Sequence, residues 1–348
     1  MEPSIFQYSL MFILPLVATL LLTPCISRLA IHAKIVDMPG LHKTHTNPRP
    51  LLGGLAIFIS FSVILLIFIP FNTKILSLLA ATIVIVVTGL WDDIRNIKPG
   101  YKLFGQTIAA SIVVLSNVES YAVLLNYFKR FYLPEFIVLG LIIGWIVLMI
   151  NAFNLIDGLD GLAVGTAAII FFSMAAISIM EGGRPVILGV QLIGAGACLG
   201  FLVFNFNPAR IFMGDIGSML LGFILATTHL FTIDYPFSTA MVLGSMFIFA
   251  YPALDVGYAI YRRLCRKNPL FKADKGHIHH VLLSLGFSVR KVVSIIYLAN
   301  FFFTLMAIML LGLSVRPLVV FFIGILTAFG VIMLFRRLLI ISEKNGVG

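Results

Sequence analysis

Charged residues and cysteines are both scarce in this chain of 348 residues. Only 11% of its residues are charged, whereas a soluble domain carries roughly 25%. Its three cysteines, Cys25, Cys198 and Cys265, are scattered, which argues against a disulfide framework and against a thiolate zinc site. No polar stretch is long enough for a separate soluble domain, since domains rarely contain fewer than ~50 residues. These shortages exclude an ordinary soluble globular protein.

Apolar sequence is what the chain has in abundance, with 60% hydrophobic residues and a mean hydropathy of +1.09. A transmembrane helix needs about 20 apolar residues. The first apolar run follows no basic segment and is too long for a signal peptide, so we expect a retained first span. We predict an all-α integral membrane protein, a bundle of about eleven transmembrane helices in one membrane-embedded domain over residues 1–348. The predicted spans are 5–27, 51–70, 75–91, 103–118, 134–150, 161–180, 186–204, 216–233, 238–258, 292–313 and 316–335.

The lysines and arginines predict the orientation of these spans. Nineteen of the 24 fall in loops on one side, and the other five are Lys74, Lys129, Arg130, Arg184 and Arg316. By the positive-inside rule, the side with more lysines and arginines is cytoplasmic. We therefore expect a protein of the cell membrane, with its N-terminus outside and its C-terminus in the cytoplasm. The net charge of +10 is then a topology signal, and nucleic-acid binding is not expected.

Histidines and aspartates share the cytoplasmic bias, although acidic residues follow the orientation rule only weakly. Six of the seven histidines and most aspartates are on that side. We therefore predict a site on the cytoplasmic face, built from loops 28–50, 92–102, 151–160, 205–215 and 259–291. The residues concerned are His32, His42, His45, His277, His279, His280, Asp37, Asp92, Asp93, Asp157, Asp160, Asp215, Asp255 and Asp274.

Two acidic segments carry the main candidates. Asp92 and Asp93 are adjacent, so ionising both is unfavourable without a nearby cation, and a raised pKa would make one of them a general base. The alternative is a helix cap or a solvated pair.

In NAFNLIDGLDGLA, Asn154, Asp157 and Asp160 are spaced three apart, so one helical turn would bring them to one side. Oxygen ligands of this kind suit Mg²⁺, and the alternative is a polar loop with a capping aspartate.

Asp215 follows Gly214 directly before an apolar run. It suits either an N-cap or a metal-ligating carboxylate at the positive end of a helix, and the two roles are compatible.

The segment FKADKGHIHHVLL supplies three histidines beside a basic run. Positions 277 and 280 share a helix face and 279 diverges. No local fourth ligand completes a zinc site, so an anion cradle is favoured over zinc. A basic loop that binds anionic headgroups is the alternative. Asp255 is an ionisable residue near the inner end of its predicted span, with Arg262 or Arg263 as its expected partner.

Taken in order, WDDIRNIKPGYKL, NAFNLIDGLDGLA, NPARIFMGDIGS and KGHIHHVLL resemble the signatures of the polyprenyl-phosphate N-acetylhexosamine-1-phosphate transferases over nearly the whole chain. The resemblance implies a membrane enzyme that moves a sugar-1-phosphate from a UDP-sugar to a lipid phosphate, releases UMP and requires Mg²⁺ or Mn²⁺. A homodimer is compatible with the family. The form HIHH, interrupted by Ile278, resembles the branch that uses UDP-GlcNAc and initiates O-antigen, common-antigen or teichoic acid chains.

The resemblance also implies roles for individual residues. Asp215 is the expected principal metal ligand and Asn154 the second. Asp92 and Asp93 match the aspartate pair, one of which acts on the lipid phosphate. The remaining residues are expected to bind or orient the substrates, with Asp157, Asp160 and His279 also catalytic: Lys102, Asn151, Asp157, Asp160, His45, His277, His279 and His280.

Two alternatives to the UDP-GlcNAc enzyme stay open. One is the phospho-MurNAc-pentapeptide transferase branch of the same family, which typically has three consecutive histidines. The other is a transporter whose intramembrane carboxylates bind ions, although transporter sites tend to lie near the membrane midplane and between repeats.

Overall fold

The computed structural model describes residues 3–38, 48–180, 182, 184–232, 247–265 and 276–312, with isolated positions between 319 and 337. A short antiparallel pair, β1 (Val36–Asp37) and β2 (Arg49–Pro50), accompanies the helices. The helices are α1 (Ile5–His32), α2 (Gly53–Phe68), α3 (Thr73–Arg95), α4 (Pro99–Ser116), η1 (Val118–Tyr121), α5 (Ala122–Lys129), α6 (Glu135–Ile156), α7 (Leu162–Met180), α8 (Pro185–Asn205), α9 (Gly214–Thr232), η2 (Phe247–Phe249), α11 (Ala250–Cys265), α12 (Ile278–Ser284) and α13 (Val289–Gly312).

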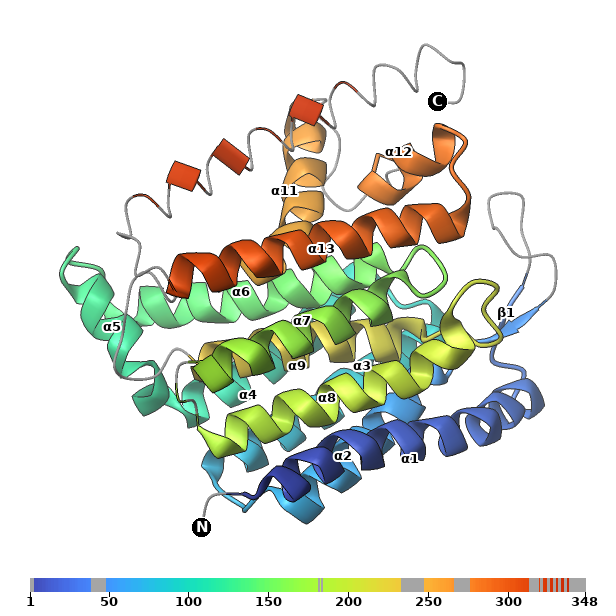
Figure 1. The fold of residues 1–348 in the computed structure, drawn as a ribbon, viewed down its shortest axis with the longest axis horizontal. Helices are drawn as coiled ribbons and strands as arrows, with labels where there is room; N and C mark the ends of the chain where they lie inside the picture. The colour runs from blue at the N-terminus through green and yellow to red at the C-terminus, as the bar shows by residue number, and fades with distance from the viewer. Residues whose placement is uncertain are drawn as a thin grey trace.

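The long helices lie side by side in one bundle (Figure 1), with α9 at its centre. Every residue of α9 from Ile216 to Phe231 is buried, and the helix packs against α2, α3, α6, α7 and α8. Its burial exceeds that of the other apolar helices, since 89% of its most apolar window is buried against 28% for α1 and 39% for α6. The element that carries Asp215 in its first turn is therefore enclosed by the rest of the bundle.

Seven helices of the described chain are long and apolar enough to cross a membrane: α1, α3, α6, α7, α8, α9 and α13. Helices suit this role because their backbone N–H and C=O groups bond within the segment. The prediction of an all-α, multi-pass membrane protein is confirmed at this level. The count of eleven spans and the external N-terminus remain predictions, and much of the predicted spans 238–258 and 316–335 lies outside the described residues.

Three boundaries differ from the sequence prediction. Helix α4 begins at Pro99 and so includes Lys102, because proline is well suited to the first position of a helix. Residues 119–129, predicted as a loop, belong to η1 and α5. Helix α11 continues past position 258 to Cys265. The prediction ended with the apolar run, whereas the rest of the helix is amphipathic and buries one face. In Figure 1, α11 runs across the direction of the long helices.

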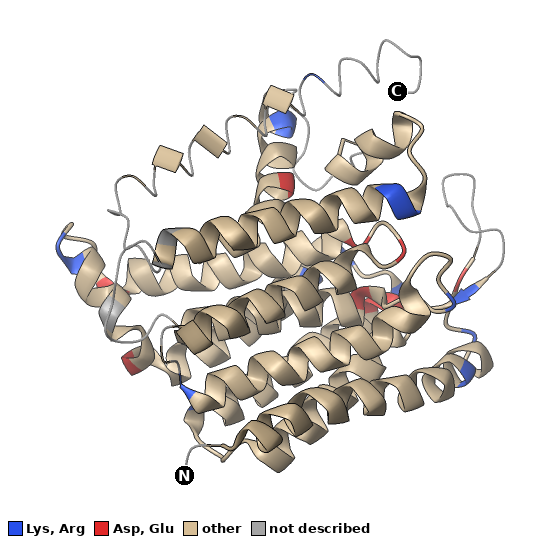
Figure 2. Cartoon of the chain, viewed as in Figure 1, with Lys and Arg blue, Asp and Glu red and all other residues tan. Residues whose placement is uncertain are grey.

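Because the long helices alternate in direction, the loops that follow α1, α3, α6 and α8 meet at the same end of the bundle. In Figure 2, several acidic positions gather at the end of the bundle nearest β1, and others lie at the opposite end and on α11. The fold therefore brings the described parts of the predicted site loops together, and the side chains there define the candidate site.

Candidate active site

A cavity of about 400 Å³ opens at this end of the bundle. It lies between the end of α6, the start of α9 and α12. Seven residues of the predicted cytoplasmic site line it: Asp37, Asp93, Asn154, Asp157, Asp160, Asp215 and His280. Segments more than a hundred residues apart thus present their polar side chains to one space.

Lys102 connects two of the aspartates. Its Nζ forms ion pairs with Asp92, at 2.5 Å from Oδ2, and with Asp215. The Oδ1 atom of Asp92 accepts the N–H of Ile97 at 2.9 Å, which closes the turn between α3 and α4. A cation between two carboxylates removes the repulsion expected in an acidic cluster. The ammonium group therefore offsets part of the repulsion between Asp92 and Asp215.

Asp93 holds the start of α9. Its Oδ1 accepts the N–H of Asp215 at 2.8 Å and its Oδ2 accepts the N–H of Ile216 at 3.3 Å. Gly214 has a φ of +71°, and a Cβ there would lie 2.5 Å from Asp93 Oδ2, so only glycine fits. The carboxylate that caps α9 thus comes from another helix, where the positive helix end stabilises it. Asp215 itself projects from the first turn.

The second oxygen of Asp215 is held by Asn154, whose Nδ2 donates to Asp215 Oδ1 at 2.8 Å. The same amide lies 3.0 Å from Ser218 Oγ, one turn further along α9. Ser218 is fully buried, and the sequence patterns gave no reason to single it out. With Lys102 on the other oxygen, Asp215 is fixed from both sides.

Asp160 ties its loop to the segment before α9. Its Oδ2 accepts N–H groups from Asn207 Nδ2 and from the Ala209 backbone, both at 2.9 Å. The neighbouring Gly161 donates to Asn205 Oδ1 at 3.1 Å, and its carbonyl accepts the hydroxyl of Tyr297 at 2.5 Å. These contacts link the loop to α8 and α13, so Asp160 shapes the wall of the cavity that it lines.

Asp157 ends α6 and faces the cavity. Burial raises its pKa well above the ordinary value, and the negative charges of Asp215, Asp93 and Asp160 raise it further. A carboxyl group in this environment is prepared either to hold a proton or to bind a cation.

Asn151 lies one turn before Asn154 and points toward α4. Its Nδ2 donates to Gln106 Oε1 at 2.7 Å, and Gln106 is almost completely buried. Asn151 is not among the residues that line the cavity. The structure thus places this predicted substrate-binding residue between two helices.

The three histidines come together in an arrangement that differs from the prediction. His277 precedes α12 as its cap residue, and its ring stacks on that of His279 at 5.8 Å with an angle of 10° between the planes. His279 and His280 lie 4.3 Å apart and are tilted by 47°. The expectation that 279 diverges is wrong, because the helix begins only after His277. The predicted site residues His42, His45 and Asp274 lie outside the described residues.

His279 is nearly fully buried, and neither of its ring nitrogens has a hydrogen-bond partner in the structure. Its Nε2 would lie 2.6 Å from a Cβ at Gly158, so the ring rests directly on the backbone of the cavity loop. Burial lowers the pKa of His279 to about 3, with smaller contributions from His280 and His277. A neutral imidazole with free nitrogens beside the cavity is suited to hydrogen bonding with a substrate.

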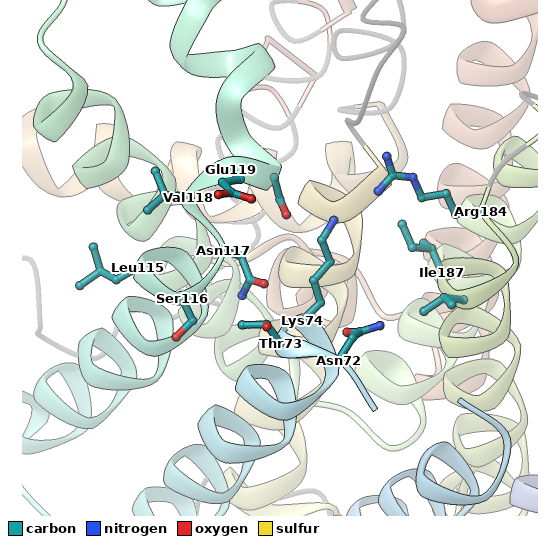
Figure 3. Close-up of a pocket in the computed structure, with 12 residues that line it drawn as sticks. Asn72, Thr73, Lys74, Leu115, Ser116, Asn117, Val118, Glu119, Arg184 and Ile187 are labelled. Carbon is teal, nitrogen blue, oxygen red and sulfur yellow. The ribbon is translucent and has the colours of Figure 1, made fainter. Parts of the chain in front are cut away.

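A larger cavity of about 680 Å³ lies at the opposite end of the bundle (Figure 3). It is lined by Lys74, Glu119 and Arg184 among others, and Lys74 also sits over the ring of Phe231. None of the predicted aspartates or histidines lines it. Chemistry that needs clustered carboxylates therefore belongs to the smaller cavity.

Comparison with known proteins agrees with this geometry. Residues 75–233 match the model of the family described as glycosyl transferase family 4. The chain is 35% identical to the "probable undecaprenyl-phosphate N-acetylglucosaminyl 1-phosphate transferase" of Bacillus subtilis (strain 168), over 97% of this chain and 91% of that protein. The chain belongs to glycosyl transferase family 4.

Other members of glycosyl transferase family 4 are similar over much of their length. The decaprenyl-phosphate N-acetylglucosaminephosphotransferase of Mycobacterium leprae (strain TN) is 34% identical over 81% of this chain and 78% of that protein. The phospho-N-acetylmuramoyl-pentapeptide-transferase of Staphylococcus haemolyticus (strain JCSC1435) is 33% identical over 84% and 96%. The family resemblance expected from the four motifs is confirmed.

Proposed function

We propose that this protein transfers GlcNAc-1-phosphate from UDP-GlcNAc to a polyprenyl phosphate, releases UMP and so initiates a cell-surface polysaccharide. The observation that carries the proposal is the convergence of Asp92, Lys102 and Asp215 beside a 400 Å³ cavity at one end of an apolar bundle. The relatives named as GlcNAc-1-phosphate transferases support the donor and the lipid acceptor. The site would lie at the cytoplasmic face, where UDP-sugars are available.

The two substrates are both anions, so charge is the main obstacle to their meeting. In the reaction an oxygen of the lipid phosphate attacks the sugar-linked phosphorus, and the bond to the UMP oxygen breaks. The lipid phosphate is largely ionised at neutral pH, since the second pKa of a phosphate monoester is about 6. Orientation of this group by the ammonium of Lys102 is therefore more important than removal of a proton from it by an aspartate.

Direct attack is favoured over a covalent aspartyl intermediate. Oxygens of Asp92, Asp93, Asp160 and Asp215 already accept hydrogen bonds or form ion pairs. A carboxylate oxygen held in this way is a weakened nucleophile. These residues are better placed to hold the site together than to form a bond to phosphorus.

The donor set suits a hard divalent cation such as Mg²⁺ or Mn²⁺. Carboxylates outnumber the basic side chain that contacts them, and Mg²⁺ usually takes one or two carboxylates plus substrate phosphates. Within the described residues no three acidic, histidine or cysteine side chains form a complete metal site, so the diphosphate would supply the other ligands. Asp215 would hold the ion, with Asp157 and the Oδ1 of Asn154 as further ligands. Such an ion neutralises charge that develops on the leaving group.

A UMP-release assay on the purified protein tests the proposal. Undecaprenyl phosphate would be combined with UDP-GlcNAc or UDP-MurNAc-pentapeptide, each with and without Mg²⁺. We expect UMP from UDP-GlcNAc only, and only with the metal. Release from UDP-MurNAc-pentapeptide instead would favour the activity named for the Staphylococcus relative. Asp215→Asn should fold and be inactive, and normal turnover in that variant would exclude Asp215 from the reaction.

A further inference from the structure

Asp255, on α11, joins the histidine segment to the bundle. Its side chain is 1% exposed, and both of its oxygens have partners. Oδ2 lies 2.8 Å from His277 Nδ1, and Oδ1 accepts the N–H of Ile278 at 2.8 Å. Within the described chain the partner of Asp255 is therefore His277, whereas the sequence had suggested Arg262 or Arg263.

This contact determines which nitrogen of His277 carries a proton. When Asp255 is ionised, its carboxylate can only accept hydrogen bonds, so Nδ1 of His277 is the protonated nitrogen. In the neutral ring Nε2 is then left as an acceptor. The orientation of the ring follows as well, because the bond leaves it no freedom to turn over.

The effect of this contact extends from His277 to the cavity. The ring of His277 lies parallel to that of His279, which in turn contacts His280. His279 rests on Gly158, and both Gly158 and His280 line the cavity. Asp255 does not line it. Its influence on the site therefore passes through the stacked rings and through the start of α12, where it binds Ile278.

Helix α12 also depends on α11 for its position. It contains seven residues, and a helix of that length is not stable in isolation. Arg262, on the same helix as Asp255, donates to the carbonyl of Gly276 at 2.7 Å. Two side chains of α11 thus bind three consecutive residues, 276–278, at the start of the histidine segment.

We propose that Asp255 is a positioning residue: it fixes the protonation and orientation of His277 and thereby places His279 and His280 against the cavity loop. Its kinetic test rests on the proposed function, but its structural test does not. Asp255→Asn keeps the size of the side chain while replacing an oxygen that can only accept with an amide that also donates.

The kinetic test is a double-mutant cycle in the full-length protein. We expect Asp255→Asn and His277→Gln each to lower kcat/KM for UDP-GlcNAc by about 10- to 100-fold, as is typical for partners that orient a functional imidazole. The double variant should be no worse than His277→Gln alone. Multiplied losses in the double variant, or an unchanged Asp255→Asn, would overturn the proposal.

Thr304→Val is the matched control. It removes a buried hydrogen bond between α13 and Ser173 of α7, away from the histidine segment. It should lower thermal stability while kcat/KM stays within about twofold of the parent. An equal kinetic loss in this control would show that the Asp255 effect is merely structural.

The second measurement is nitrogen NMR of histidine-labelled protein, with the His277 signal assigned through His277→Gln. We expect Nδ1 to be protonated in the parent and the proton to move to Nε2 in Asp255→Asn. A bare Nδ1 in the parent would overturn the proposal even if Asp255→Asn fails to fold. If the parent releases no UMP from UDP-GlcNAc, the proposed function fails while this spectrum still tests Asp255.

Discussion

Asp93 accepts the backbone N–H of Asp215 across 122 residues of chain, at 2.8 Å. The contact joins the last turn of α3 to the first turn of α9 and fixes where the Asp215 carboxylate emerges. A member of the aspartate pair that the sequence indicated for chemistry on the lipid phosphate thus also has a geometric task.

Replacing Asp93 separates these two roles. Asp93→Ala removes the cap of α9 and should lower the free energy of unfolding by about 0.5–2 kcal/mol. Asp93→Asn keeps one acceptor, so it should recover much of that stability and be clearly more active than Asp93→Ala. Thermal unfolding and UMP release measured on both variants provide the check. If Asn and Ala are equally inactive although the Asn variant is stable, the charge of Asp93 takes part in the chemistry.

Lys102 competes with any cation for Asp215, because its ammonium group pairs with that carboxylate. Lys102→Met should reduce turnover on the order of 10²-fold, as expected for loss of a charge-stabilising donor. The same variant should show a larger Mg²⁺-induced rise in unfolding temperature than the parent, since ligand binding to the folded state stabilises it. Equal Mg²⁺ responses in the two proteins would show that the ion does not bind near Lys102.

Asp157→Asn should lower the activity of the protein and raise its thermal stability. The pKa of Asp157 is raised in the folded state. At a pH above the ordinary pKa of aspartate, the unfolded chain carries the negative charge freely, whereas the folded protein is destabilised by it. At pH 7.5 without divalent ions the variant should therefore unfold a few degrees higher than the parent. The difference should shrink as the pH falls toward the ordinary pKa of aspartate, where the unfolded chain also becomes protonated. A lower unfolding temperature at pH 7.5 would contradict this account.

His279 should make the protein sensitive to acid. Its pKa of about 3 lies below the ordinary value of 6.5, so the unfolded chain takes up a proton first as the pH falls. Stability from the neutral ring is complete above pH 6.5 and declines below it. His279→Gln should lose less stability than the parent between pH 7 and pH 5, measured by thermal unfolding. His32→Gln, at the exposed end of α1, is the control and should follow the parent.

The membrane architecture and the meeting of the motifs were predictable from sequence. Apolar runs and alternating loops are enough to bring Asp92, Asp157 and Asp215 to one end of a bundle. Individual partners were not predictable, because they depend on the distance between helices far apart in the chain. The capping of α9 by Asp93, the contact of Asn151 with Gln106 and the pairing of Asp255 with His277 are examples.

The predicted helix boundaries were wrong where the local pattern of apolar residues is ambiguous. Residues 119–129 lie between two predicted spans and lack an apolar run long enough for a third, so the sequence did not predict their helices. The geometry of the histidines depends on where α12 begins, which Asp255 and Arg262 of α11 help to determine.

The cap on α9 also sets an order of events during synthesis. Asp93 leaves the ribosome long before residues 215 and 216, whose amide groups it binds in the finished protein. Until that stretch is translated and inserted, the carboxylate lacks these partners, and the start of α9 lacks its cap.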